Sequence, residues 1–297
     1  MNTFLSLLLN GISLGALYAL IALGFVIIFK SSEVVSFMHG SLLLLGAYVI
    51  AKANDATGSF ALAVVIGVAV AALAALLTER LIINRLRGAP VITLAIVTIG
   101  VDIVIFTEMV RRIGSDILNV IHPWGGDAVS LGGVSISENR LWAMLVAGVL
   151  IGLFFLAFKF SNWGIAMRAA AEDGETAALM GIRRGRVSAL AWVVAGVLAA
   201  VAGLFLVGTP TPGVAPGVYA VALRAFPAAI LGGLDSTGGA LVGGLIIGVA
   251  ESLAAGYQDQ LLFLGRGFGN VVPYVVMIAV LLVRPSGLFG TKELTRV

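Results

Sequence analysis

The chain has 297 residues, of which 60% are hydrophobic and 11% are charged, and its formal net charge is +3. Soluble domains carry about 45–50% apolar and about 25% charged residues, so this composition argues against a water-soluble globule. The sequence has no cysteine and two histidines, which excludes disulfides and thiolate metal sites and leaves little for a zinc or histidine-base enzyme. Its 18 Lys and Arg residues do not cluster as a nucleic-acid surface would, so no nucleic-acid partner is expected.

Seven low-charge stretches are predicted to cross a membrane, where a helix needs roughly 20 apolar residues. The first, 1–29, has no charged side chain, and it lacks the basic start and short apolar run of a cleaved signal peptide. We expect it to be a permanent helix. The others follow at 34–51, 56–78, 91–110, 141–158, 187–208 and 267–283.

The stretch 225–255 is different, because Asp235 and the glycines of 231–239 divide it into pieces too short to cross singly. We expect two half-helices that meet near the middle of the bilayer, since irregular backbone survives there only where protein or a wet cavity satisfies it. The predicted fold is an all-α polytopic membrane protein, a single transmembrane domain over 1–297 with about 7–9 transmembrane helices and broken or re-entrant half-helices in each half.

Lysine and arginine set the predicted orientation, because cytoplasmic loops are enriched in both. One arrangement places 12 of the 18 on a single side, in the segments near 30–33, 79–90, 159–186 and 284–297. That side is predicted to be cytoplasmic, with the N-terminus outside.

The residues 111–140 then form an external loop. Apolar residues alternate within it, at 129, 131, 134 and 136 around Gly132-Gly133, which predicts a small β-hairpin. Two roles remain open for this hairpin: contact with an external partner, or a cap over helix ends.

Two polar, glycine-containing interruptions, 36–41 and 235–239, each precede an apolar helical run and fall in opposite halves of the chain. Paired interruptions of this kind indicate a binding or translocation site near the midplane, where helix N-termini present unpaired N–H groups. The alternative is that these side chains only cap buried helix starts. The predicted translocation-pathway residues are Ser36, His39, Gly40, Ser41, Asp102, Asp235, Ser236, Thr237 and Gly238.

Three ionisable groups in apolar stretches have open roles. Asp102 lies inside a predicted span, where an aspartate costs roughly 2.5–3.5 kcal/mol, so it is expected to face protein or water. His39 fits either a proton relay or ligand contact, or a structural role beside a helix start. Glu251 fits either a gate or an interfacial anchor.

The segment 159–186 is predicted to be a cytoplasmic coupling loop. It contains two short helices that meet at Asp173-Gly174, with Asp173 as the cap of the second and Gly181 at its end. The apolar residues of the second helix face neither lipid nor an evident core, so the patch either binds a partner or lies on the headgroups. The predicted coupling residues are Arg168, Ala169, Glu172, Asp173, Gly174, Ala177, Leu179 and Gly181.

Several ordered motifs resemble the membrane permease subunits of bacterial ABC importers for branched-chain amino acids, a family that also includes permeases for urea and short amides. The motifs cover nearly the whole chain, at 15–24, 36–40, 45–48, 167–173, 181–182, 228–233, 238–244 and 287–290. The chain departs from the familiar pattern at Ser36, where Asn is usual, and at Ser41, where an acidic residue is common, which leaves the substrate open.

The resemblance implies a multi-pass subunit of the bacterial inner membrane that moves a small amino acid by alternating access. It also implies four partners: a second homologous permease in a heterodimer, two cytoplasmic ATP-binding subunits and a periplasmic solute-binding protein. No G-x-x-x-x-G-K-[ST] loop occurs in the sequence, and no catalytic residue, cofactor or metal is expected. A stand-alone secondary transporter or channel, working through Asp102, His39 or Asp235, is the main alternative, and an intramembrane enzyme lacks a nucleophile–base constellation.

Overall fold

The protein is an all-α bundle with one short hairpin in the computed structural model, which describes residues 2–114, 118–120, 122–124, 127–131, 134–208 and 213–291. The elements, in chain order, are α1 (Asn2–Ser32), α2 (His39–Thr57), α3 (Phe60–Leu81), η1 (Ile83–Leu86), α4 (Val91–Ile113), β1 (Ala128–Leu131), β2 (Val134–Ser137), α5 (Glu138–Phe160), α6 (Asn162–Glu172), α7 (Gly174–Leu179), α8 (Arg184–Leu206), α9 (Gly217–Gly232), α10 (Thr237–Gly256), η2 (Gln258–Leu264), η3 (Phe268–Asn270) and α11 (Val272–Val283).

Six helices in the described part of the chain are long and apolar enough to cross a membrane, which confirms the all-α polytopic class. They are α1, α3 with its extension η1, α4, α5, α8 and α10. The predicted crossing at 267–283 contains a shorter helix than expected, because α11 has 12 residues and a crossing needs roughly 20. The helix in the predicted span 34–51 starts late, at His39, because residues 34–36 have no regular structure and residues 37–38 form a turn.

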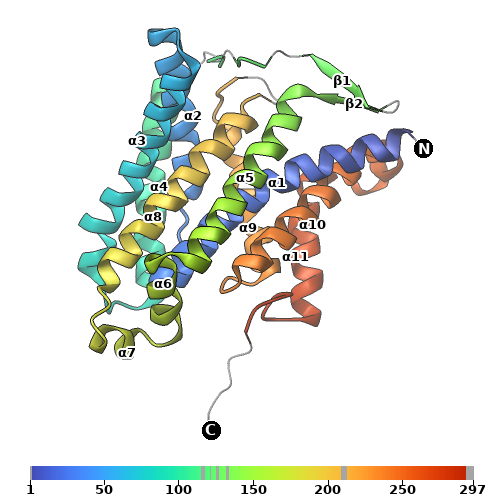
Figure 1. The fold of residues 1–297 in the computed structure, drawn as a ribbon. Coiled ribbons are helices and arrows are strands. Elements are labelled where there is room, and N and C mark those ends of the chain that lie inside the picture. Colours follow the sequence, from blue (N-terminus) through green and yellow to red (C-terminus); the bar gives the residue numbers. More distant parts are fainter. Residues whose placement is uncertain are drawn as a thin grey trace.

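The bundle is built around α1 and α8, whose apolar windows are 83% and 78% buried. Figure 1 shows α1 running obliquely through the molecule, with α5 and α10 beside it. Around α8 lie α1, α2 and α3. The apolar windows of α3, α4 and α5 are only 22%, 17% and 22% buried, as expected for helices that face lipid.

Small residues allow α1 and α10 to pack with their backbones in contact. Gly11 lies against Val249, Gly15 against Leu245, and Gly244 against Ala19, so the two helices run antiparallel. Without a hydrophobic driving force between helices in lipid, such close backbone approach is a main source of helix association.

The bundle has two distinct ends (Figure 1). The hairpin end carries the antiparallel pair β1–β2, in which Val129 pairs with Ile136, together with the starts of α1 and α5. The α6–α7 end carries the two short helices and the end of α1. The strands confirm the predicted hairpin, whose turn at Gly132-Gly133 lies outside the described residues.

The predicted path of 225–255 needs correction. Two helices do flank an interruption at 233–236, but α10 has 20 residues and is itself long enough to cross. The interruption lies at the α6–α7 end, not in the middle of the bundle, because the Lys30 ammonium at the end of α1 donates a hydrogen bond to the main-chain oxygen of Asp235 at 2.9 Å. The two helices therefore form an antiparallel hairpin that turns at one end of the bundle.

Candidate functional site

The first predicted interruption, 36–41, is an irregular segment up to Met38 followed by the start of α2, and most of it is buried inside the bundle. Residues 34–36 have no regular structure, and α2 begins at His39, which packs against Gly24, more than two turns before α1 ends. The Thr98 hydroxyl of α4 accepts a hydrogen bond from the Phe37 main-chain N–H at 3.1 Å. A protein side chain thus satisfies a main-chain N–H of this irregular segment, as irregular backbone within a membrane-spanning bundle requires.

The side chains of this helix start are packed. Ser36, His39 and Ser41 are at most 1% exposed, and the Ser41 hydroxyl donates to the main-chain oxygen of Met38 at 2.9 Å. The His39 ring lies 4.6 Å from that of Phe25, and neither of its nitrogens has a hydrogen-bond partner within the described residues. These groups lie between helices in this conformation.

Asp102 is buried against protein, as predicted. Its side chain, in α4, accepts a hydrogen bond from the Tyr219 hydroxyl of α9 at 2.6 Å, and its other oxygen has no partner among the described residues. The Tyr219 ring packs on Gly40 at the start of α2, where a Cβ atom would lie 2.7 Å from it, and on Phe106 at 4.4 Å. Ser36, His39, Gly40, Ser41 and Asp102 therefore belong to one region.

The residues of the second interruption belong to another region. Asp235 accepts hydrogen bonds from the main-chain N–H of Thr291, at 2.9 Å, and from its hydroxyl. The Ser236 hydroxyl caps α10 by accepting from the Gly239 N–H at 3.0 Å, and Thr237 and Gly238 form the first turn. The prediction that both interruptions meet at one midplane site is therefore wrong. The alternative role given above, the capping of a helix start, describes Ser236.

The two short helices of the loop 159–186 form as predicted. The Asp173 carboxylate caps α7 by accepting from the N–H groups of Glu175 and Thr176, both at 3.0 Å, and from the Thr176 hydroxyl at 2.5 Å. These hydrogen bonds, the Thr176 hydroxyl first among them, hold the pKa of Asp173 below its usual value. Gly181 ends the unit with φ +87°, the left-handed conformation that favours glycine.

This unit presents a small apolar surface. Leu179 and Met180 are 88% and 80% exposed, whereas Ala177 is 5% exposed and faces inward, so the predicted patch is smaller than the sequence indicates. Arg168 of α6 donates to the main-chain oxygens of Phe158 and Lys159, and Ala169 accepts the Asp173 N–H. Gly174 lies against the Arg184 side chain.

The rest of α6 faces the end of α1 and the α9–α10 turn. Arg168 and Glu172 line a cavity of about 310 Å³ together with Lys30, Asp235 and Thr291. The predicted coupling residues are thus adjacent to the second interruption, a juxtaposition that the sequence alone does not reveal.

Removing the Asp173 carboxylate should loosen α7 alone. In the Asp173→Ala variant we expect faster amide hydrogen exchange at Thr176 to Leu179, because two N–H groups lose their acceptor, and unchanged exchange in α6. Because the pKa of Asp173 is lowered in the folded state, the cap is present above the usual carboxyl pKa of about 4 and is lost as the pH falls through the lower value. Exchange that stays the same in the variant at neutral pH would contradict this cap.

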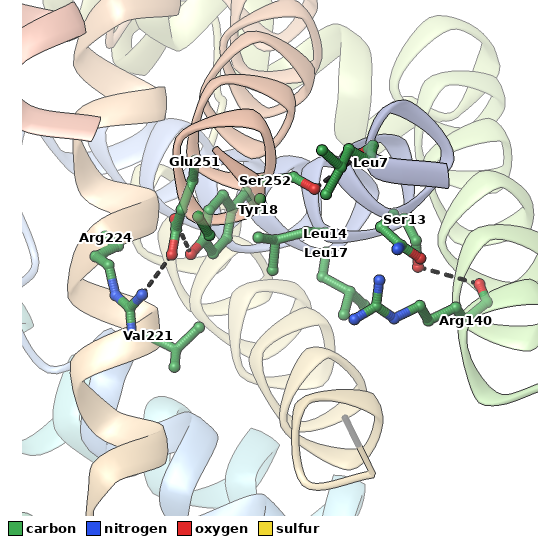
Figure 2. Close-up of a pocket in the computed structure, with 13 residues that line it drawn as sticks. Leu7, Ser13, Leu14, Leu17, Tyr18, Arg140, Val221, Arg224, Glu251 and Ser252 are labelled. Carbon is green, nitrogen blue, oxygen red and sulfur yellow. Dashed lines mark hydrogen bonds and ion pairs between the residues drawn. The ribbon is translucent and has the colours of Figure 1, made fainter. Parts of the chain in front are cut away.

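A third region, which sequence reasoning largely missed, is a cavity of about 370 Å³ toward the hairpin end (Figure 2). Glu251 of α10 accepts a hydrogen bond from the Tyr18 hydroxyl at 2.6 Å and forms an ion pair with Arg224 of α9. Arg224 also donates to the Asn270 side chain at 2.8 Å. The sequence offers one signal for this region: Arg224 and Glu251 are isolated charged residues in apolar stretches, and the structure pairs them.

Helix α9 separates the first region from this cavity. Tyr219 lies toward α2 and α4, whereas Val221 and Arg224 line the cavity. A two-residue step in a helix rotates the side chain by about 200°, so these residues lie on opposite faces. The helix contains Pro227, which cannot donate to the helical ladder, and ends at the interruption.

Comparison with known proteins matches residues 7–281 to the family described as branched-chain amino acid transport system / permease component. The chain is 31% identical to the high-affinity branched-chain amino acid transport system permease protein LivH of Escherichia coli (strain K12) over 99% of this chain and 98% of that protein. It is 31% identical to BraD of Pseudomonas aeruginosa, a permease protein of the same description, with the same coverage. A probable branched-chain amino acid transport permease protein LivH of Methanocaldococcus jannaschii is 32% identical over 94% of this chain and 91% of its own length.

Proposed function

Because the chain belongs to the family of branched-chain amino acid transport system permease components, we propose that this multi-pass protein of the bacterial inner membrane is the permease subunit of an ATP-driven importer. It translocates branched-chain or other small neutral amino acids by alternating access. The match over residues 7–281 carries this proposal. Its partners are a second homologous permease in a heterodimer, two cytoplasmic ATP-binding subunits and a periplasmic solute-binding protein.

The energy for transport comes from the partner subunits. The sequence has no phosphate-binding loop of the G-x-x-x-x-G-K-[ST] type, so ATP acts through another chain. The α6–α7 end faces the cytoplasm in this proposal, because the segments placed there hold 12 of the 18 Lys and Arg residues. The loop 111–140 with its hairpin then lies outside, where a solute-binding protein docks.

The ATP-binding subunits dock on α7. Leu179 and Met180 are 88% and 80% exposed on a unit that is anchored to the bundle, since Met167 is fully buried and the Trp163 indole donates a hydrogen bond to the main-chain oxygen of Val187 at 3.2 Å. A rigid base with two exposed apolar side chains suits a partner that pushes on it. Arg168, Ala169, Glu172, Asp173, Gly174 and Gly181 shape this base.

Movement of this unit reaches the bundle through the contacts of α6 with α1 and through the cavity that α6 shares with the α9–α10 turn. Arg168 and Glu172 share a cavity with Lys30 and Asp235, so a displaced α6 changes the surroundings of the turn. From there α9 extends between the region of Asp102 and the cavity of about 370 Å³ toward the hairpin end, which we call the outer cavity. A shift of α9 therefore alters both. We propose that α9 is the moving wall, and that Ser36, His39, Gly40, Ser41 and Asp102 line the pathway in another conformation.

A charged residue at the docking surface should uncouple transport from ATP. With Leu179→Asp we expect the ATP-binding subunits to be lost on co-purification and ATP-dependent leucine uptake in proteoliposomes to fall to background, because an acid replaces an apolar contact that is 88% exposed in the isolated chain. The permease itself should elute normally in size-exclusion chromatography.

The matched control is Ser59→Asp, an acid introduced at the exposed N-cap of α3, where aspartate is well tolerated. It should leave uptake unchanged. Normal co-purification and uptake with Leu179→Asp would remove the proposed coupling surface. Uptake that a protonophore abolishes while ATP is held constant would instead indicate a secondary transporter.

A further inference from the structure

The outer cavity combines an apolar wall with an unpaired positive charge. It is enclosed by the first half of α1, the start of α5, α9 and the end of α10, with a volume of about 370 Å³ (Figure 2). Leu14, Leu17 and Val221 contribute aliphatic surface. Ligand cavities of a few hundred Å³ with mostly apolar linings and a few polar groups are typical of small-molecule sites.

Two arginines and one glutamate are the charged residues that line this cavity. Glu251 is neutralised by Arg224 and also accepts the Tyr18 hydroxyl. Arg140 differs. Its main-chain oxygen accepts a hydrogen bond from the Ser13 hydroxyl at 3.2 Å, and its side chain extends from α5 toward α1 (Figure 2). Within the described residues, its guanidinium has no hydrogen bond or ion pair. The cavity therefore carries one uncompensated positive charge.

We propose that this cavity is a binding site for the carboxylate of an α-amino acid with an aliphatic side chain, and that Arg140 binds the carboxylate. Arginine presents a planar fork of N–H donors that matches a carboxylate in a bidentate pair. Leu14, Leu17 and Val221 then receive the aliphatic side chain. This inference rests on the proposed transport function and narrows it, because urea and short amides have no carboxylate and lose this contact.

The position of the cavity fits a site of entry. Its lining comes from the starts of α1 and α5 and the end of α10, all at the hairpin end, which is external in the proposed orientation. Val221 and Arg224 belong to α9, so binding here acts directly on the proposed moving wall. An amino acid released by an external binding protein meets Arg140 before it reaches the region of Asp102.

The test uses the absence of cysteine from the chain, which makes a single introduced thiol a specific reporter. The full-length Val221→Cys permease in nanodiscs is labelled with a maleimide, and the rate is measured with leucine, with leucinamide or with no addition. We expect leucine to slow labelling and leucinamide, which keeps the side chain and the amine, to leave it unchanged. In the background of Arg140→Gln, half-maximal protection should need at least about tenfold more leucine, since a hydrogen-bonded charge is lost.

The control is Arg111→Gln, which removes an arginine at the same end whose side chain is 72% exposed and paired with Glu108. It should leave protection intact, and Arg140→Lys should keep part of it. Equal protection by leucine and leucinamide, or protection unaffected by Arg140→Gln, would overturn the proposal. Protection by phosphatidylglycerol with none by leucine would assign Arg140 to a lipid phosphate and would also overturn it.

This labelling needs neither ATP nor a partner subunit. Loss of ATP-dependent uptake with intact leucine protection would count against the proposed importer and leave the cavity assignment standing. ATP-dependent uptake of leucine without any protection at Val221→Cys would overturn the cavity assignment and leave the proposed importer standing.

Discussion

Replacing Gly248 with valine should strongly destabilise the permease. Gly248 lies against the backbone of Gly15, and a Cβ atom added there would meet the Gly15 nitrogen and Cα, neither of which can move as the end of a side chain can. Overpacking a tight contact costs about 1–3 kcal/mol. One or two kcal/mol already changes the folded-to-unfolded ratio about 5–30-fold. We expect the monodisperse peak in detergent to shrink, the melting temperature to fall and the membrane-inserted chain to become more protease-sensitive.

The matched control is Gly148→Val, in α5, where nothing lies within 4 Å of an added Cβ atom. The same substitution in another apolar helix should give a normal yield. If Gly248→Val and Gly148→Val behaved alike, backbone contact between α1 and α10 could not be what holds the centre of this bundle together.

Features that depend on local sequence were predictable. The long apolar runs gave α1, α3, α4, α5 and α8 close to their observed places, and alternation gave the hairpin strands. The position of Asp173 between two runs of helix formers predicted the N-cap of α7, which the structure contains. Each of these rests on neighbours within one or two turns, so a single sequence contains the necessary information.

The errors arise where distant segments decide the outcome. The interruption at 233–236 looked like a midplane break because glycines and the polar Asp235 divide an apolar run, but its depth depends on the antiparallel packing of α10 on α1. Glycine spacing indicates that a helix packs closely, not against which helix or at what level. The similarity of the two interruptions therefore concealed different positions.

The site residues that were missed have partners far away in sequence. Tyr219 bonds to Asp102 across 117 positions, and Tyr18 bonds to Glu251 across 233. A tyrosine in an apolar run does not indicate which distant residue its hydroxyl will bond. By contrast, Asp102 was identifiable in isolation, because a carboxyl group inside a span is costly wherever its partner lies.

Both networks fix α9: Tyr219 attaches one face to α4, and Arg224 attaches the other to α10. With both interactions formed, α9 is held in one conformation. Movement of α9 during transport therefore requires that at least one of the two interactions break. The attachment at Asp102 is the smaller, with a single hydrogen bond, and its second oxygen has no partner in the described part of the chain. We therefore expect Asp102 to act in transport and in stability together.

Tyr219→Phe should reduce stability, because it leaves the buried Asp102 side chain without its donor, and an unsatisfied buried polar group costs about 1–3 kcal/mol or more when charged. Measured as the melting temperature of the purified permease, this loss should be recovered in the double variant Asp102→Leu with Tyr219→Phe, in which both polar groups are gone.

Uptake separates the two roles of Asp102. If Asp102 lines the pathway, the stable double variant should still fail to transport leucine with its ATP-binding partners. Full uptake by the double variant would mean that Asp102 and Tyr219 serve the fold alone. The Phe106→Leu variant removes the ring packed 4.4 Å from Tyr219 without touching the hydrogen bond, so it should change the melting temperature modestly and leave transport in place. The Tyr219→Phe single variant, which lacks the hydroxyl and keeps Asp102, completes the comparison. Uptake that the single variant retains and the double variant loses assigns the loss to the Asp102 carboxylate.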